Sequence, residues 1–282
     1  MIELQRWAEL DVSAASGIVV ADGVFYVVAD DENFLGVYAS NGAPLSRISL
    51  LSGVLPDEHA ARKRDKLDIE ALTALPDGRL VGFGSGSTAA RRRGVLVDLL
   101  GGRAHLFDLT PLYQLLEREI PEVNVEGAAV RGDRLWLAQR GNGQSGVNAL
   151  IELRLGRVLE GLAAGGLDAA SFCGLIPVAL GDLEGVPLGM TDLAAHPDHG
   201  LLFTAAAEAS VDTYQDGACV GSVVGQLACD GRVLRCESIS VRCKLEGIAV
   251  GRLTQDSMQV WLVADPDDRG QRAPLYAAML SR

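Results

Sequence analysis

The stretch KLEGIAV, residues 244–250, places a glutamate directly before a glycine and a short apolar run, where a buried strand would not ordinarily carry a charge. The same pattern recurs as NVEGAAV at 124–130, DIEALTA at 68–74 and MTDLAAH at 190–196. It recurs once more as ASGIVV at 15–20, with serine in place of the acid. Five copies of one pattern indicate an internal repeat.

The repeat has a nearly constant period and closes on the chain ends. The intervals are 54, 56, 66 and 54 residues when counted between Ser16, Glu70, Glu126, Asp192 and Glu246. The 36 residues after Glu246 and the 16 up to Ser16 together supply one more interval of similar length. A closed ring of five units predicts a radial architecture, in which each unit buries its apolar faces against its neighbours.

The pattern inside each unit predicts strands. After each acid comes a small apolar segment, a turn and a second apolar segment, as in GAAV-RGD-RLWLA at 127–138. Runs of four to five residues rich in Val, Leu, Ile and aromatics, bounded by Gly, Pro and Asp, are typical of buried strands. Third strands follow in most units and fourth strands in some. Four strands in each unit of a closed ring predict an all-β fold, a β-propeller.

Five blades fit the spacing best, with six as the alternative. The last unit ends after its third strand, LYAAML at 275–280, so we expect the N-terminal IELQRWAEL at 2–10 to supply its fourth strand. The longest interval contains residues 160–189, which we interpret as a long connection because the extra length is too short for a blade. Leucines at helical spacing predict a short helix within 110–121.

Composition favours one soluble domain over residues 1–282. The net charge of −12 argues against nucleic acid as a partner, because phosphates would be repelled. No apolar segment reaches the roughly 20 residues of a membrane span, and the charged start lacks the apolar core of a signal peptide. We therefore expect a cytoplasmic protein without a membrane partner. The five cysteines form no CxxC pair and are expected to be buried free thiols rather than disulfides or zinc ligands.

Propeller topology gives the repeated acid a place. The first strand of each blade is innermost, so Glu70, Glu126, Asp192 and Glu246 should converge at one mouth of the central channel, with Ser16 in the fifth position. Carboxylates at short range raise one another's pKa or recruit a cation. Calcium, with 6 to 8 oxygen ligands, suits such a ring. The alternatives are that each acid accepts hydrogen bonds from backbone N–H groups, or that one of the carboxylates is catalytic.

The loops after the second strands should share this face and are the most polar connections in the chain. They supply candidate ligand-binding residues, for which ordinary loop solvation is the alternative: Asp30, Ser85, Arg93, Arg140, Asn142, Glu208, Asp212, Tyr214 and Asp265. The GSGS stretch before the arginines at 91–93 could hold an anion, although it is not a P-loop. The acids and tyrosine of 207–217 could hold a second cation or a sugar-like hydroxyl ligand.

Several of these segments carry a resemblance. The stretches 68–99, 124–143, 207–222 and 244–250 resemble a bacterial family of propeller proteins of unknown function. More distantly, the D/N-x-E-G-A motif at the blade starts is similar to phytase-like and SdiA-regulated propellers, and this resemblance implies calcium in or near the channel. A phytase surrounds its phosphate with basic side chains, whereas this chain has three lysines. Propeller lactonases of the gluconolactonase kind include asparagines in their metal site, and the matching positions here are Glu and Asp.

Three functions remain open on the sequence. The first is a non-enzymatic propeller that uses its acid-bearing face to bind a small polar ligand, a cation or a protein. The second is a calcium-dependent hydrolase of a lactone or phosphoester. The third is a structural module for protein interaction, which would present an apolar patch at the blade rims.

Overall fold

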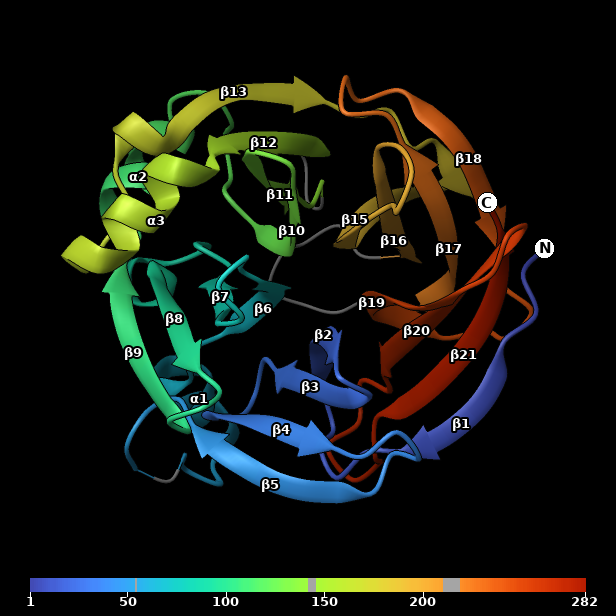
Figure 1. Ribbon diagram of the computed structural model, residues 1–282, viewed down its shortest axis with the longest axis horizontal. Helices are drawn as coiled ribbons and strands as arrows, with labels where there is room; N and C mark the ends of the chain where they lie inside the picture. Colours follow the sequence, from blue (N-terminus) through green and yellow to red (C-terminus); the bar gives the residue numbers. More distant parts are fainter. Residues whose placement is uncertain (54, 142–145, 210–218) are drawn as a thin grey trace.

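The computed structural model describes residues 1–53, 55–141, 146–209 and 219–282. Its strands form five antiparallel sheets that follow one another around a central axis (Figure 1). The fold is therefore an all-β propeller of five blades, as the repeat predicts. None of the helices in the described ranges has the length and hydropathy of a membrane-spanning segment. The five cysteines are free thiols, but the expectation that they are buried is wrong, because Cys173 and Cys236 are exposed and the other three are only partly covered.

The first three blades each run outward in chain order. Blade 1 consists of β2 (Ala15–Ala21), β3 (Val24–Ala29), β4 (Phe34–Tyr38) and β5 (Pro44–Ser49). Blade 2 consists of β6 (Ile69–Ala74), β7 (Leu80–Gly84), β8 (Arg93–Asp98) and β9 (Arg103–Asp108). Blade 3 consists of β10 (Val125–Arg131), β11 (Arg134–Gln139), β12 (Ala149–Arg154) and β13 (Phe172–Pro177).

Blades 4 and 5 complete the ring. Blade 4 consists of β15 (Val186–Ala195), β16 (Leu201–Glu208), β17 (Cys219–Leu227) and β18 (Val233–Ser238), with the two-residue β14 (Asp182–Leu183) paired to β15. Blade 5 consists of β19 (Lys244–Leu253), β20 (Ser257–Asp265), β21 (Pro274–Ser281) and the N-terminal β1 (Gln5–Glu9). β1 pairs antiparallel with β21, so the chain ends share one blade as predicted.

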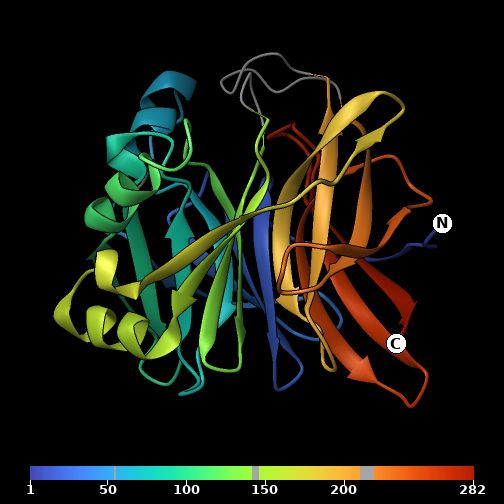
Figure 2. The same cartoon turned by 90° about the horizontal axis from the view of Figure 1, so that it is seen from above.

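Short helical segments lie in the connections between the strands of the ring. α1 (His59–Asp65) and η1 (Ala89–Arg91) lie in loops of blades 1 and 2, and the expected helix within 110–121 is present as α2 (Thr110–Leu116). α3 (Leu155–Ala164) and η2 (Ala169–Ser171) lie between β12 and β13. The interpretation of 160–189 as a mere connection is wrong, because this segment contains the end of α3 and the whole of β13. Figures 1 and 2 show α2 and α3 against the outside of blades 2 and 3.

The apolar core is divided among the blade interfaces. Buried residues form five clusters, and each cluster joins two adjacent blades. Phe83 of blade 2 and Leu137 of blade 3 share one cluster, for example, and Phe25 of blade 1 and Trp261 of blade 5 share another. Because each of these clusters is shared by two neighbouring blades, every blade buries both of its faces only when the ring is closed.

Candidate functional site

A one-residue β-bulge interrupts the pairing of the first and second strands in every blade. The bulge residues, which have no direct partner across the pair, are Ser16, Glu70, Glu126, Thr191 and Glu246. Bulges redirect a side chain and are common near functional sites. The recurring glutamate is therefore the bulge residue of an innermost strand. The alignment of Asp192 with the other acids is wrong by one residue, because the bulge falls on Thr191.

The two hydroxyl side chains among the bulge residues tie neighbouring blades together. Ser16 Oγ donates to the Ile69 carbonyl at 2.7 Å, and Thr191 Oγ1 donates to the Leu245 carbonyl at 2.7 Å. In each case the acceptor belongs to the first strand of the next blade. A carboxylate has no proton for such a bond when ionised. The three bulge glutamates are therefore the ones available for other contacts at the channel.

Asp192 has the structural role that was the alternative to metal binding. Its carboxylate accepts the backbone N–H groups of Leu193 at 2.7 Å and of Ile248, in blade 5, at 2.8 Å. A third bond comes from the N–H of Ala128 in blade 3. Burial raises the pKa of Asp192 well above its ordinary value, and these three bonds oppose that rise. Asp192 thus joins three blades through hydrogen bonds, and its carboxylate is not free to join a cation ring.

The glycine after the acid is explained by the narrowness of the ring. A Cβ on Gly127 would lie 2.6 Å from Asp192 Cα, in the first strand of the next blade. A Cβ on Gly247 would lie 2.6 Å from Val263 Cγ2 and 3.3 Å from Gly17 Cα. Innermost strands pack backbone to backbone at these points, so a side chain there would force the blades apart.

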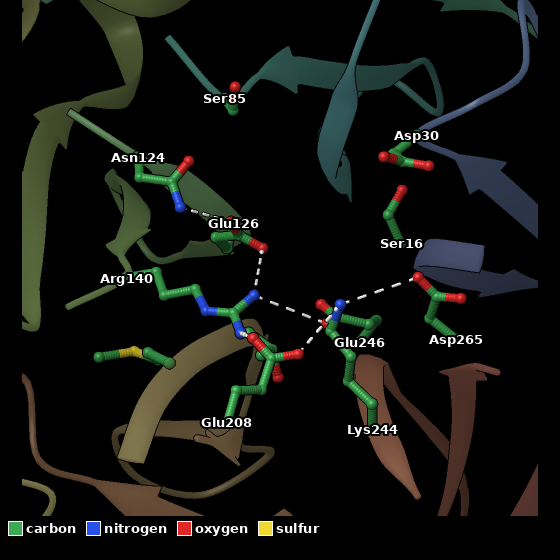
Figure 3. Close-up of polar contacts among 12 residues, drawn as sticks. Ser16, Asp30, Ser85, Asn124, Glu126, Arg140, Glu208, Lys244, Glu246 and Asp265 are labelled. Carbon is green, nitrogen blue, oxygen red and sulfur yellow. Dashed lines mark hydrogen bonds and ion pairs between the residues drawn. The ribbon is translucent and has the colours of Figure 1, made fainter. Parts of the chain in front are cut away.

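Arg140 stands at the centre of the acidic side chains of blades 3, 4 and 5 (Figure 3). Its Nη2 donates to Glu208 Oε2 at 2.5 Å, and its Nη1 lies 3.4 Å from Glu126 Oε2 and 3.6 Å from Glu246 Oε1. The Arg140 side chain is only 7% exposed. Asn124 Nδ2 completes the surroundings of Glu126 with a 2.6 Å bond to Oε1. A guanidinium of the chain itself therefore lies between two of the glutamates that were expected to share a cation.

Lys244 provides a second internal cation in the same region. Its Nζ lies 3.2 Å from Glu208 Oε1, 3.3 Å from Glu246 Oε1, 3.2 Å from Asp267 Oδ1 and 3.8 Å from Asp265 Oδ2. Burial alone would lower the pKa of Lys244, but Glu246 and Glu208 outweigh it and raise the pKa well above its usual value. The ammonium therefore stays charged at neutral pH.

A second group of acids lies across blades 1 and 2. Carboxylate oxygens of Asp30, Asp68 and Glu70 lie within 4.8 Å of one another. Lys66 Nζ donates to Asp30 and lies 2.9 Å from Asp68 Oδ1. Glu70 makes no hydrogen bond or ion pair within the part of the chain that the structure describes. The lack of any such partner among the described residues distinguishes Glu70 from Glu126, Glu208 and Glu246, which pair with Arg140.

Asp68 is held from two further directions. Arg91 Nη1 lies 3.1 Å from Asp68 Oδ2, and Ser85 Oγ donates to the same oxygen at 2.5 Å. The Asp68 backbone has a φ of 58°, in the left-handed region that a non-glycine residue adopts only when its surroundings demand it. The side chain is 1% exposed.

Acids outnumber bases at this mouth, and burial shifts the pKa of several acids upward. Among the described residues, eight carboxyl groups face four basic side chains, namely Asp30, Asp68, Glu70, Glu126, Glu208, Glu246, Asp265 and Asp267 against Lys66, Arg91, Arg140 and Lys244. Burial raises the pKa of Glu126 to about 8 although Arg140 opposes the rise. Burial also raises the pKa of Asp265 to about 8 against the effect of Lys244. The mouth therefore holds protons or attracts cations at neutral pH.

The pKa of Glu70 is raised as well, for a combined reason. Burial is the largest cause, and the charges of Asp68 and Asp30 add to it, while Lys66 opposes it. Burial likewise raises the pKa of Glu246 and of Asp30, in each case against a neighbouring lysine. A further cation placed among these carboxylates would lower their pKa values and favour the ionised forms.

Most of the remaining candidate residues are at this mouth. Asp30, Ser85, Arg140, Glu208 and Asp265 lie at or just after the ends of second strands, as the topology predicted. Arg93 differs: it is exposed at the start of β8, where it makes no ion pair with any described residue, and Arg91 reaches Asp68 in its place. The candidates Asn142, Asp212 and Tyr214 lie outside the described residues.

Sequence reasoning missed Lys66, Asp68, Asn124 and Lys244, although a signal was present. Asp68, Asn124 and Lys244 each lie two residues before a bulge glutamate, and Lys66 lies four residues before Glu70. The segments are KLDIE at 66–70, NVE at 124–126 and KLE at 244–246. Side chains two apart in a strand share one face, so a polar residue two before the acid should also face the channel. Two of the only three lysines are in these segments.

The residues present fit a cation in one place only within the described chain. The four acids Glu70, Glu126, Asp192 and Glu246 do not gather around one point, whereas Asp30, Asp68 and Glu70 do. Three carboxylates at this separation suit the ligand oxygens of calcium, which lie about 2.3–2.6 Å from the ion. The Lys66 ammonium contacts two of the three, so an incoming cation would have to displace it.

Comparison with known proteins places the chain in a family. A model of a family of unknown function, DUF6929, matches residues 11–280. The chain belongs to this family. No protein of curated function matches the sequence.

Among solved structures, the chain resembles several ring-shaped proteins at low sequence identity. Glutaminyl cyclase of Myxococcus xanthus has 12% identity and a TM-score of 0.55 over 100% of this chain and 98% of that one. The calcium-binding protein regucalcin of Agrobacterium tumefaciens has 12% identity and a TM-score of 0.51 over 99% and 95%. The tail fibre of Staphylococcus aureus phage P68 has 13% identity and a TM-score of 0.55 over 99% and 53%. Likeness at this level shows the fold alone.

Proposed function

We propose that this DUF6929 member is a non-enzymatic binding protein that holds a cation, or the positive group of a small polar ligand, at the acid-bearing mouth of its channel. The observation that carries the proposal is the group of Asp30, Asp68 and Glu70, whose carboxylate oxygens lie within 4.8 Å of one another. Glu70 in this group has no ion pair or hydrogen bond among the described residues. A carboxyl whose pKa is raised by burial and by neighbouring carboxylates either keeps its proton or recruits a positive ligand.

Calcium is the cation that these donors favour. Carboxylate oxygens are the ligands of hard cations, and calcium tolerates the irregular geometry that residues from two blades impose. The resemblance of the blade-start motif to phytase-like and SdiA-regulated propellers also supports calcium. Arg140 and Lys244 already pair with acids of blades 3, 4 and 5, and this supports a ligand site on the half of the mouth formed by blades 1 and 2.

The test is ligand-dependent stability of chelator-treated protein. Thermal unfolding is measured with calcium, with magnesium and with putrescine, the last as a probe for an organic ammonium ligand, and the purified protein is also subjected to elemental analysis. A ligand at 100 times its dissociation constant stabilises the fold by about 2.7 kcal/mol. We expect this gain with calcium and its loss in Glu70→Gln.

The matched control is Asp133→Asn, which removes one negative charge from a side chain that is 85% exposed in the turn between β10 and β11, on the opposite face. It should keep the full calcium effect. Stabilisation by putrescine alone would identify an organic cation as the ligand. If none of the three probes stabilises the protein and no metal copurifies, the proposed cation site is refuted.

A second candidate function rests on Glu126. Its pKa of about 8 keeps the carboxyl protonated at neutral pH, and Asn124 and Arg140 hold it at the mouth. A protonated carboxyl can act as a general acid. This geometry supports the alternative of a calcium-dependent hydrolase of lactones or phosphoesters. Turnover of a member of an ester, lactone and phosphoester panel, abolished in Glu126→Gln, would support it, and no turnover by the calcium-loaded protein would refute it.

A further inference from the structure

The turn between β15 and β16, on the face opposite the acidic mouth, is built around a buried histidine. His196 is 2% exposed, and its Nδ1 accepts the backbone N–H groups of Asp198 at 3.1 Å and of His199 at 3.3 Å. An Nδ1 that accepts hydrogen bonds carries no proton, so the neutral ring must carry its proton on Nε2. His196 thus acts in this turn as the acceptor that an Asn or Asp side chain provides in an Asx-turn.

The turn is clasped by the blades on both sides. From blade 3, Arg131 donates to the His196 carbonyl at 3.1 Å and to the Asp198 carbonyl at 2.8 Å. From the end of blade 5, Arg282 donates to the Asp198 carboxylate at 2.8 Å and to the Thr254 carbonyl at 3.0 Å. The turn of blade 4 therefore links three blades, and its shape depends on the acceptor at its centre.

Protonation of His196 conflicts with these contacts. A proton on Nδ1 would point at two N–H groups, and Nε2 has no acceptor among the described residues. The charged groups that face the ring are Asp198 and His199 of the same turn, Arg131 from β10 and Arg282 after β21. Burial lowers the pKa of His196, His199 and the two arginines lower it further, and only Asp198 opposes them.

We propose that His196 is an acid-sensitive latch, whose protonation opens the β15–β16 turn and releases it from Arg131 of blade 3 and Arg282 of blade 5. The proton binds Nδ1 and the two main-chain hydrogen bonds to that atom break. The closed turn is fully stable above the pKa of the open state, about 6.5. As the pH falls below that value, the open fraction rises by up to about tenfold per pH unit, until the lower pKa of the closed state is reached.

The latch and the mouth respond to acid in opposite directions. Because burial raises the pKa values of Glu126 and Asp265, acidification through pH 8 relieves buried charge and stabilises the mouth. A measurement of global stability would mix the two effects. The test must therefore read the turn locally.

Hydrogen exchange with mass spectrometry provides that local measurement, on the peptide covering 195–201 and corrected for the intrinsic pH dependence of exchange. Between pH 7.5 and 5.5 we expect protection of this peptide to fall about tenfold, while the corresponding turn at 75–79 of blade 2, which has no histidine, keeps its protection. In His196→Asn, whose side-chain oxygen replaces Nδ1 and does not titrate, the protection should be independent of pH.

His199→Asn is the matched control, because His199 is exposed and stacks on His196 with ring centroids 6.4 Å apart. Its peptide should keep the pH response of the unsubstituted protein. Equal protection at both pH values in the unsubstituted protein would overturn the latch. A pH response that survives in His196→Asn, or that disappears in His199→Asn, would overturn it as well, because another group would then be the one that titrates.

Discussion

Replacing Arg140 by methionine is expected to destabilise the fold by about 3–5 kcal/mol at pH 8, the range for removing one partner of a buried ion pair. Methionine retains much of the stem that packs over Gly189, where Arg140 Cγ lies 3.1 Å from the position of a Cβ. The change therefore isolates the charge. It leaves Glu126, Glu208 and Glu246 without the guanidinium that now lies within 3.6 Å of each.

The loss of stability in the Arg140→Met variant should be smaller at low pH. Arg140 lowers the pKa values of Glu126 and Glu246, so both pKa values rise when it is removed, and the folded variant binds protons that the unfolded chain does not. One such proton recovers about 1.4 kcal/mol for each pH unit. Glu126, whose pKa is already about 8, binds its proton below pH 8 in the unsubstituted protein as well, so the recovery comes chiefly from Glu246, and the loss of stability at pH 5.5 should be smaller than the loss at pH 8.

Urea unfolding followed by circular dichroism measures the loss of unfolding free energy at pH 8 and at pH 5.5. The control is Arg157→Met, which removes an exposed ion pair to Glu160 on α3, at 52% and 66% exposure. Exposed pairs of this kind contribute less than about 0.5 kcal/mol. A loss below about 1 kcal/mol at pH 8 for the Arg140 variant, or an equal loss at both pH values, would refute the description of Arg140 as a buried counter-ion for the three glutamates.

Three further outcomes follow from the contacts at the mouth. Lys66→Met should raise calcium affinity about tenfold by calorimetry, because about 1.4 kcal/mol of competition by the ammonium is removed. The control Arg64→Met, on the exposed side of α1, should leave the affinity unchanged. Weaker calcium binding in the Lys66 variant would contradict this prediction. Asp192→Ala should lower the free energy of unfolding by about 3 kcal/mol, because buried N–H groups lose their acceptor, and calcium affinity should not change. Loss of calcium binding in this variant would show that Asp192 is a metal ligand. Gly127→Ala should lower the free energy of unfolding by about 2 kcal/mol. The control Gly156→Ala in α3, where a Cβ meets nothing within 4 Å, should raise it by up to about 1 kcal/mol. Equal changes in the free energy of unfolding would refute the close approach of the innermost strands.

The fold could be predicted because its signals are local and repeated. Short apolar runs separated by Gly, Asp and Pro predict strands and turns without reference to the rest of the chain. The period of the acid-containing pattern predicts the number of blades, and the unit that lacks a fourth strand predicts the pairing of β1 with β21. The β13 strand was missed because its sequence, FCGLIP at 172–177, does not alternate between apolar and polar residues, and most of these residues are only partly buried.

The candidate site was predicted in place but not in composition. Its position follows from the rule that first strands start, and second strands end, at one mouth. The error at Asp192 arose because TD at 191–192 has two polar residues in succession, and a bulge of one residue decides which of them faces the channel. The role of Arg140 could not be predicted, because its three partners come from three blades and no local pattern links them.

The propeller, the pairing of both chain ends in one blade and the acid–glycine pair of the innermost strand all follow from the amino-acid sequence alone. These features depend on residues close to one another in the chain, or on their repetition. The folded arrangement of the blades determines which acids pair with Arg140 and Lys244, which acid is bound by backbone N–H groups, and which three acids gather beside Lys66. Those outcomes depend on distances of a few ångströms between separate blades, over which the interaction of buried charges changes by several kcal/mol.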